Sequence, residues 1–156
     1  MRGRTPGRPG EVRKTRRDWW GVVLDAPNAK ALGQFYADVF GWVLNAEDPS
    51  FVTLDPGEGV GYLAVQTSQG YVPPTWPNEP GRQQMQLHLD IEVDNLDEAV
   101  GAAVALGATQ AAYQPQHDVR VLLDPAGHPF CLYCPGWPLP RAWPTPGAWS
   151  ARAQQR

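Results

Sequence analysis

Two stretches decide the fold of this chain: VVLDAPNAKALGQFYADVF at positions 22–40 and LDIEVDNLDEAVGAAVALG at positions 89–107. Each contains a short apolar run, an asparagine and a helical pattern that stops at a glycine, Gly41 or Gly107. The two asparagines, Asn28 and Asn95, stand 67 positions apart, and an asparagine directly before a helical pattern is a preferred N-cap. The chain therefore predicts the same strand–helix unit twice.

The similarity continues past each helix. A strand runs into Leu54-Asp55-Pro56 in the first copy and into Leu123-Asp124-Pro125 in the second, and a further strand follows each turn. Solenoids need at least three stacked repeats. Two copies instead predict an α+β fold, in which two tandem βαβββ modules form one pseudo-twofold domain with a shared cleft.

Composition divides the chain into five segments. The N-terminal segment is rich in Arg, Pro and Gly and has almost nothing apolar to bury, which predicts disorder. The C-terminal segment carries Trp137, Trp143 and Trp149; because three indoles are costly to leave in water, we expect it to pack on the domain or to contact a partner. The predicted segments are a basic arm at 1–18, modules at 19–68 and 85–134, a linker at 69–84 and a Pro/Trp-rich tail at 135–156.

Length and cysteine content restrict the class of protein. With 156 residues, the chain can form one domain with a sizeable core. No apolar run reaches the roughly 18 residues of a membrane span, and the N-terminus lacks the apolar stretch of a signal peptide. Cys131 and Cys134 are too few for a disulfide framework or a four-thiolate zinc site, and we interpret their spacing as accidental. These features predict a cytoplasmic protein.

Charge is distributed unevenly behind a net charge of −3. Positions 19–134 hold three Lys or Arg against fourteen Asp or Glu, whereas positions 1–18 hold seven against two and positions 135–156 hold three against none. A negative domain favours cationic ligands and disfavours nucleic acid in its cleft. The alternative is an acidic surface that serves solubility.

The stretch Met85–Val93 alternates strictly between apolar and polar residues, which predicts a strand with one face on the helices. Its other face carries Gln86, His88, Asp90 and Glu92. This face can be solvated, but in a repeated domain with both helices behind the sheet it can line the cleft, and His88 is then the best candidate ligand or general base. By the same parity, the last strands of the two modules add Tyr62, Ala64, Gln66, Cys131 and Tyr133 to this face.

Three features recur together in one known group of proteins. They are the repeated strand–helix–three-strand plan, Phe35-Tyr36 followed by Phe40-Gly41-Trp42, and Asp124-Pro125-Ala126-Gly127-His128-Pro129-Phe130. In these features the chain resembles the vicinal oxygen chelate superfamily, the glyoxalase/bleomycin-resistance/dioxygenase group, and within it the glyoxalase-like proteins of undefined activity. The resemblance covers about residues 19–134. It implies a homodimer in which a second subunit contributes to the cleft.

For the metal-using members, the resemblance implies a divalent ion held by four side chains from four strands. Only His88 is a usual ligand at the matching positions, because glycine and alanine side chains cannot coordinate and a cysteine replaces a carboxylate. Gln66 and Asp90 could substitute in part, which is a poor set for a tight catalytic metal. We therefore expect no cofactor, and a divalent metal could bind only through the incomplete set around His88. The matching positions are Gly21, His88, Cys131 and approximately Ala64.

The incomplete ligand set separates the function classes. Glyoxalase I, extradiol dioxygenase and related lyase activities need a metal with open positions, whereas the bleomycin-resistance branch sequesters a cationic ligand without one. We expect a small-molecule-binding protein of this second kind, with no nucleic-acid or membrane partner. The alternatives are a metal-dependent lyase or dioxygenase that uses His88, and a metal-free acid–base enzyme that uses His88 with Asp90. The predicted ligand-binding residues are His88, Asp90, Gln66, Tyr62, Cys131, Tyr133 and Glu92.

Overall fold

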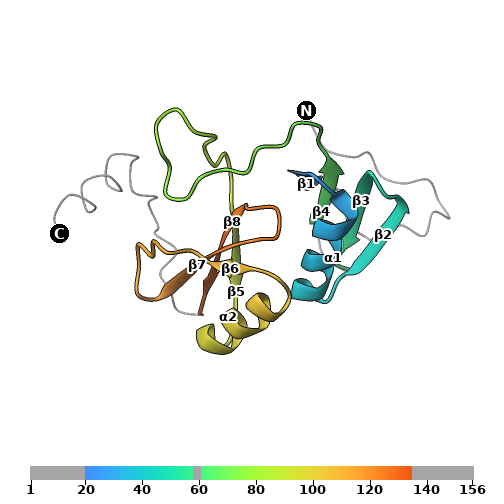
Figure 1. Cartoon of the computed structure of the whole chain (residues 1–156). Helices are drawn as coiled ribbons and strands as arrows, with labels where there is room; N and C mark the ends of the chain where they lie inside the picture. The colour runs from blue at the N-terminus through green and yellow to red at the C-terminus, as the bar shows by residue number, and fades with distance from the viewer. Residues whose placement is uncertain (1–19, 58–60, 135–156) are drawn as a thin grey trace.

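The computed structural model describes residues 20–57 and 61–134 and confirms the α+β class with two βαβββ modules (Figure 1). In module one the sheet order is β1-β4-β3-β2, with β1 and β4 parallel and the other pairs antiparallel. The long crossover through the helix is what places β1 beside β4. The elements of module one are β1 (Trp20–Ala26), α1 (Ala29–Phe40), β2 (Val43–Asp48), β3 (Phe51–Asp55) and β4 (Gly61–Thr67).

Module two repeats this topology. Its sheet order is β5-β8-β7-β6, again with the first pair parallel and the others antiparallel. β5, β6 and β8 are shorter than their counterparts, most of all the two edge strands β5 and β6, whereas β7 has five residues like β3. The elements of module two are β5 (Leu89–Glu92), α2 (Leu96–Ala105), β6 (Thr109–Gln110), β7 (Val119–Leu123) and β8 (Pro129–Tyr133).

Both helices begin at the predicted asparagine caps. Asn28 has extended backbone angles, and its side chain accepts a hydrogen bond from the Ala31 N–H. Asn95 accepts from two N–H groups, those of Asp97 and Glu98. These bonds satisfy donors that a helix leaves free in its first turn. Gly41 ends α1 at φ 66°, a left-handed conformation that glycine adopts at little cost.

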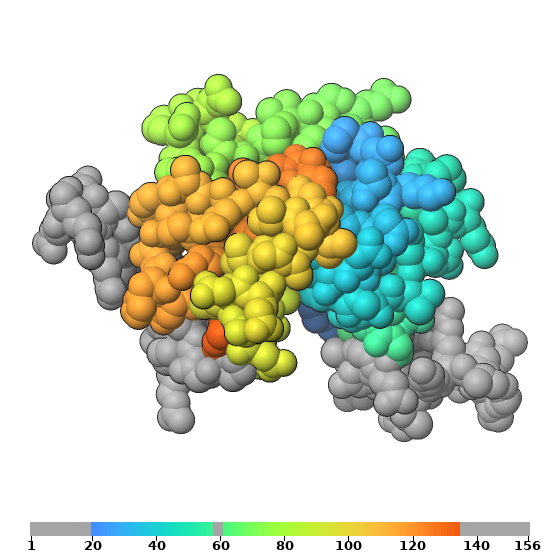
Figure 2. Space-filling model, turned by 60° about the horizontal axis from the view of Figure 1, so that its bottom comes forward, coloured from blue at the N-terminus to red at the C-terminus, as the bar shows by residue number. Residues whose placement is uncertain are grey.

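The hydrophobic core is shared between the modules but is denser around α1. This helix buries an apolar stripe, including Leu32, Phe35 and Tyr36, against the strands of module one. The rings of Phe35 and Phe130 lie 6.1 Å apart, so α1 also contacts β8 of module two. In α2, by contrast, Ala103 is the only buried residue. One continuous core therefore holds the two modules together, as their close contact in Figure 2 shows.

The strand predicted at Met85–Val93 is shorter in the structure, and its first four residues are not in the sheet. The parallel ladder with β8 begins at Leu89, which pairs with Phe130. The first residue of β8, Pro129, has no N–H to donate to a longer ladder, and the chain before it forms a turn. Leu87, expected against the helices, is consequently 46% exposed. Leu89 and Ile91 do pack on the core, as the alternation predicted.

The predicted basic arm at 1–18 and the Pro/Trp-rich tail at 135–156 lie outside the described residues. The segment that connects the modules runs from β4 to β5 across one side of both of them (Figure 1). Among the described residues, no helix is long and apolar enough to cross a membrane.

Candidate functional site

A cavity of about 520 Å³ lies where the two modules meet the connecting segment. This volume is within the range of small-molecule sites in proteins. The walls come from β1, the end of β4, the connecting segment, the approach to β5 and the turn before β8, so both modules contribute. Its polar side chains are those of Asp25, Tyr36, Gln66, Ser68, Tyr71, Gln83, Gln84, Gln86, His88 and His128.

The lining is rich in hydrogen-bond acceptors. Asp25 and Gln66 are partners in the β1–β4 ladder, and the Gln66 amide Nε2 donates to Asp25 Oδ1 at 2.7 Å. Between β4 and β5, the side-chain amides of Gln83 and Gln86 donate to the Gln84 carbonyl at 3.2 and 3.4 Å. Among the described residues, the cavity wall includes neither Lys nor Arg. The electrostatics of this wall thus favour a ligand that donates hydrogen bonds or carries positive charge.

Beside the cavity, His88, Asp90 and Cys131 form a compact polar group. Asp90 and Cys131 are partners in the β5–β8 ladder, and His88 directly precedes β5. His88 Nε2 lies 3.2 Å from Asp90 Oδ1, and this hydrogen bond is the main cause of the lowered pKa of Asp90. Burial, and then the charge of Asp90, raises the pKa of Cys131 to about 12. Cys131 is therefore a protonated thiol at neutral pH.

The other predicted site residues lie apart from His88. Glu92 and Tyr133 pair with each other at the far end of the β5–β8 ladder, and neither lines the cavity. Tyr62 lies in a separate apolar hollow of about 300 Å³, which also includes Trp20 and Trp42. Of the seven predicted residues, the structure thus places Gln66 and His88 in the cavity wall and gathers Asp90 and Cys131 around His88.

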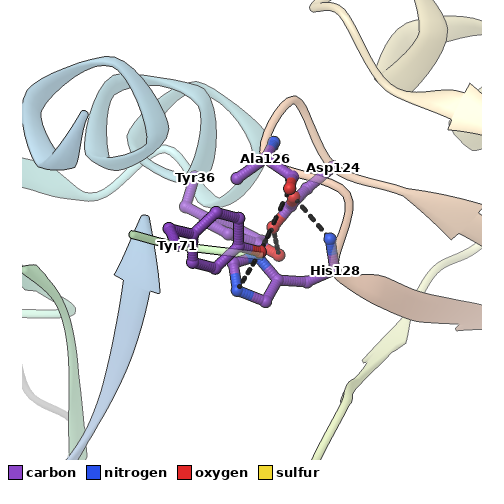
Figure 3. Close-up of polar contacts among 5 residues, drawn as sticks. All are labelled: Tyr36, Tyr71, Asp124, Ala126 and His128. Atoms are coloured by element: carbon purple, nitrogen blue, oxygen red, sulfur yellow. Dashed lines mark hydrogen bonds and ion pairs between the residues drawn. The ribbon is translucent and has the colours of Figure 1, made fainter. Parts of the chain in front are cut away.

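A buried network on the cavity wall joins both modules and the connecting segment (Figure 3). The Asp124 side chain is at its centre. Oδ2 accepts from the Tyr36 hydroxyl at 2.9 Å and lies 2.8 Å from His128 Nδ1, while Oδ1 accepts from the Ala126 and His128 N–H groups. The Tyr71 hydroxyl donates to the Ala126 carbonyl at 3.0 Å and lies 3.0 Å from His128 Nε2.

These contacts account for the polar groups of the network. Four donors surround the Asp124 carboxylate, which compensates its burial. The contact with the Asp124 carboxylate requires a proton on His128 Nδ1, and the Tyr71 hydroxyl lies within hydrogen-bond distance of both His128 Nε2 and the Ala126 carbonyl. Burial, and then the charge of Asp124, raises the pKa of Tyr36 well above its usual value, so this hydroxyl remains a donor.

Sequence reasoning identified the Asp124–Phe130 stretch as a turn and did not place it in the site. The period of two in β8 says nothing about His128, which precedes the strand. The partner of Asp124, Tyr36, is 88 positions away. A signal did exist, because Asp124 follows a buried strand and has a histidine four residues later, a spacing at which a turn can bring the two side chains together.

The model of the glyoxalase-like domain matches residues 21–133. This chain belongs to the glyoxalase-like family. Residues 21–133 include both modules and all residues of the cavity wall. The comparison with curated proteins gives no significant match.

Solved structures share the fold of this glyoxalase-like protein. A glyoxalase/bleomycin resistance protein/dioxygenase family enzyme from Burkholderia phytofirmans PsJN superposes with a TM-score of 0.56 at 22% identity, over 73% of this chain and 95% of that one. A glyoxalase-related enzyme from Fulvimarina pelagi gives 0.53 at 17% identity, over 76% and 88%. A possible glyoxalase from Bacillus cereus gives 0.52 at 13%, over 73% and 96%. At these identities the similarity shows the fold alone.

The four strand positions that would hold a metal in metal-using relatives do not form a ligand set in this protein. Gly21 and Ala64 have no ligand atoms, and Ala64 is fully buried. A Cβ atom on Gly21 would lie 2.5 Å from the ring of Tyr62, so this ring fills the space that a ligand from position 21 would need. A metal ion held by all four strands does not fit these residues.

Proposed function

We propose that this glyoxalase-like protein binds a small organic molecule with an ammonium or similar cationic group in the cavity between its modules. The observation that carries the proposal is the chemistry of the wall. It combines the Asp25 carboxylate with glutamine amides and, among the described residues, has no Lys or Arg. A charged hydrogen bond from the ligand to Asp25 would orient it, and the amides would select its polar groups.

The position of Asp25 supports this role. Its Oδ1 atom already accepts from Gln66, so the carboxylate is held in place before a ligand arrives, which lowers the entropic cost of binding. Asp90 lies beside His88, which also belongs to the wall. Residues 19–134 hold fourteen acidic residues against three basic ones. The resulting field attracts cations toward the cavity.

The test is calorimetry with spermidine and agmatine as cationic probes and glutarate as an anionic one. We expect binding of a cationic probe that weakens between 0.05 and 0.5 M salt, since screening lengths shorten from roughly 10 Å to a few Å over such a range. Asp25→Asn should weaken it about tenfold, as expected for a lost hydrogen bond to a charged group.

Glu47→Gln is the matched control. Glu47 is an exposed acidic residue of module one and is not in the cavity wall, so this variant removes the same charge at a distance from the site. Probe affinity should be almost unchanged. Binding of glutarate in preference to the cations, or equal losses in the two variants, would contradict the proposal.

A metal-free acid–base role for His88 is the second candidate function. It is favoured by the 3.2 Å contact between His88 Nε2 and Asp90 Oδ1, because a carboxylate can orient an imidazole and stabilise its protonated form. Such an enzyme should exchange a carbon-bound proton of a 2-oxo acid with solvent deuterium, and His88→Ala should abolish the exchange. Proton NMR in D₂O measures this directly, and exchange that survives in the variant would contradict the role.

A further inference from the structure

We propose that the cavity binds its cationic ligand more tightly when His128 is neutral, so that binding releases a proton from a protonated His128 ring through Tyr71. The proposal rests on the cation site described above and adds its regulation by pH. Both residues belong to the cavity wall. The Tyr71 hydroxyl lies 3.0 Å from His128 Nε2, and His128 Nδ1 lies 2.8 Å from Asp124 Oδ2. A chain of contacts thus leads from the cavity to a buried carboxylate (Figure 3).

The Tyr71 hydroxyl has one proton and two neighbours that can accept it. Its oxygen lies 3.0 Å from both the Ala126 carbonyl and His128 Nε2. When the His128 ring is neutral, its proton is on Nδ1, toward Asp124, and Nε2 can accept from Tyr71. When the ring is protonated, Nε2 donates to the Tyr71 oxygen, and the Tyr71 proton goes to the Ala126 carbonyl. The protonation of His128 therefore determines the direction of its hydrogen bond with Tyr71.

These two states differ in what Tyr71 offers to a ligand. With neutral His128, the Tyr71 hydroxyl donates to the network, and its oxygen can accept a hydrogen bond from an N–H group of the ligand. With protonated His128, the same oxygen already accepts from Nε2. The imidazolium also adds a positive charge to a wall that, among the described residues, has no Lys or Arg. Because like charges repel more strongly where water is partly excluded, a cationic ligand binds better to the neutral state.

Tyr71 is coupled to the proposed cation site and is held firmly in place. Burial, and then the charges of Asp124 and Asp25, raise the pKa of Tyr71, so Tyr71 remains a hydroxyl and the field of Asp25 reaches it. Two residues along the connecting segment, Pro73 contacts the turn before β8. Gly127 in this turn has φ 94°, and a Cβ atom on it would lie 2.7 Å from Pro73 Cβ. This close contact fixes the segment, so the two states differ in proton positions and not in the path of the chain.

Several titratable groups could make binding depend on pH. Imidazole is the side chain that ordinarily titrates between about pH 5 and 8. The His128 ring faces Asp124, directly after β7, and Tyr71; the Tyr36 hydroxyl of α1 shares the Asp124 carboxylate. Variants must therefore separate His128 from the other groups. The titratable side chains of the wall itself are Asp25, Tyr36, Tyr71, His88 and His128.

The experiment is calorimetry of the full-length chain at constant ionic strength with agmatine, whose charges do not change between about pH 5.5 and 8. Coupling between two sites typically changes an affinity by about 5–150-fold, so agmatine should bind at least about fivefold more tightly at about pH 8 than at about pH 5.5. Because the coupling is reciprocal, binding at the lower pH should release a fraction of a proton per ligand. Binding heats in two buffers of different ionisation enthalpy measure this release.

Three variants assign the proton. His128→Gln should bind agmatine with little dependence on pH and release no proton. Tyr71→Phe keeps the contact between His128 and Asp124 but removes the hydroxyl, so it should weaken binding more at about pH 8 than at about pH 5.5. His117→Gln is the matched control, because the His117 side chain is 97% exposed and is not in the wall; it should keep both effects. Circular dichroism checks each fold, and Tyr71→Phe decides if His128→Gln does not fold.

The possible failures are distinguishable. Absence of agmatine binding at both pH values would contradict the cation site and, with it, the coupling to His128. Binding without pH dependence or proton release would overturn the coupling and leave the cation site intact. The coupling would also be overturned if folded His128→Gln still released the proton, if His88→Gln lost the release instead, or if Tyr71→Phe kept the full pH dependence.

Discussion

Modules one and two share a backbone plan but place different side chains on corresponding rungs of their parallel ladders, and one rung shows the contrast. In module one this rung pairs Val23 with Ala64, and in module two it pairs Asp90 with Cys131. The first pair is apolar, while the second belongs to the cluster around His88. The same backbone plan thus occurs in both modules, and the side chains on each rung decide what chemistry that rung can carry.

The two helices also differ in how many of their residues are buried. α1 buries six of its twelve residues, whereas α2 buries one of ten. Burial of apolar area is the main source of stability in a domain. We infer that module one is the stable scaffold against which the shorter strands of module two are positioned. Matched substitutions at comparable positions of the two modules test this difference.

The largest effect is expected at the Leu-Asp-Pro turns. Asp124→Ala removes a buried carboxylate and leaves the Tyr36 hydroxyl, the His128 ring and two N–H groups without their acceptor. Loss of one partner from a buried charged network typically costs about 3–5 kcal/mol. Urea denaturation monitored by circular dichroism gives the free energy of unfolding.

The corresponding residue of module one, Asp55, supplies the control. It is exposed, and within the part of the chain that the structure describes its side chain accepts from one group, the Gly57 N–H, at 2.7 Å. Asp55→Ala should therefore cost no more than about 1 kcal/mol. If Asp124→Ala is too unstable to purify, Asp124→Asn keeps the shape and still weakens the contact with His128. Equal costs at the two turns would show that the modules are not held together by this network.

The contrast between these turns also shows what the sequence could predict. The asparagine caps, the helical stripe of α1 and the alternation in β5 are local patterns, and the structure bears them out because each pattern and its cause lie within a few residues. The Asp124–Tyr36 contact depends on how the modules pack. The position of the Tyr62 ring over Gly21 depends on the pairing of β1 with β4. Periodicity within a single strand or helix does not contain that information.

A second, smaller effect is expected at the helix glycines. In α1 a Cβ atom on Gly33 would lie 2.5 Å from Val52 Cγ2, whereas in α2 a Cβ atom on Gly101 would meet nothing within 4 Å. Alanine favours a helix by about 1 kcal/mol over glycine, but overpacking a core costs about 1–3 kcal/mol. Gly33→Ala should therefore destabilise the protein and Gly101→Ala should stabilise it.

Thermal unfolding of the two variants under identical conditions measures this difference, and Tm should move in opposite directions. The double variant Gly33→Ala, Val52→Ala should lose less stability than the sum of the losses of the two single variants, because the shorter side chain at position 52 removes the clash. A rise in Tm for both single alanine variants would mean that α1 can move away from β3, and the description of module one as a rigid scaffold would then be wrong.

The smallest effect is expected at the helix caps. Asn95 accepts from two N–H groups and donates to Glu98 Oε1 at 3.1 Å, whereas Asn28 accepts from one. The start of α1 also has another partner, because the Thr67 hydroxyl accepts from the Ala29 N–H at 3.2 Å. Removing an asparagine cap costs about 0.5–2 kcal/mol of stability, so we expect a cost near the upper end for Asn95→Ala and near the lower end for Asn28→Ala.

Amide hydrogen exchange measures this difference. The Asp97 and Glu98 N–H groups should lose protection in Asn95→Ala, whereas the first turn of α1 should keep more of its protection in Asn28→Ala. Greater loss at α1 would indicate that its start depends on the asparagine more than on its anchorage to β4.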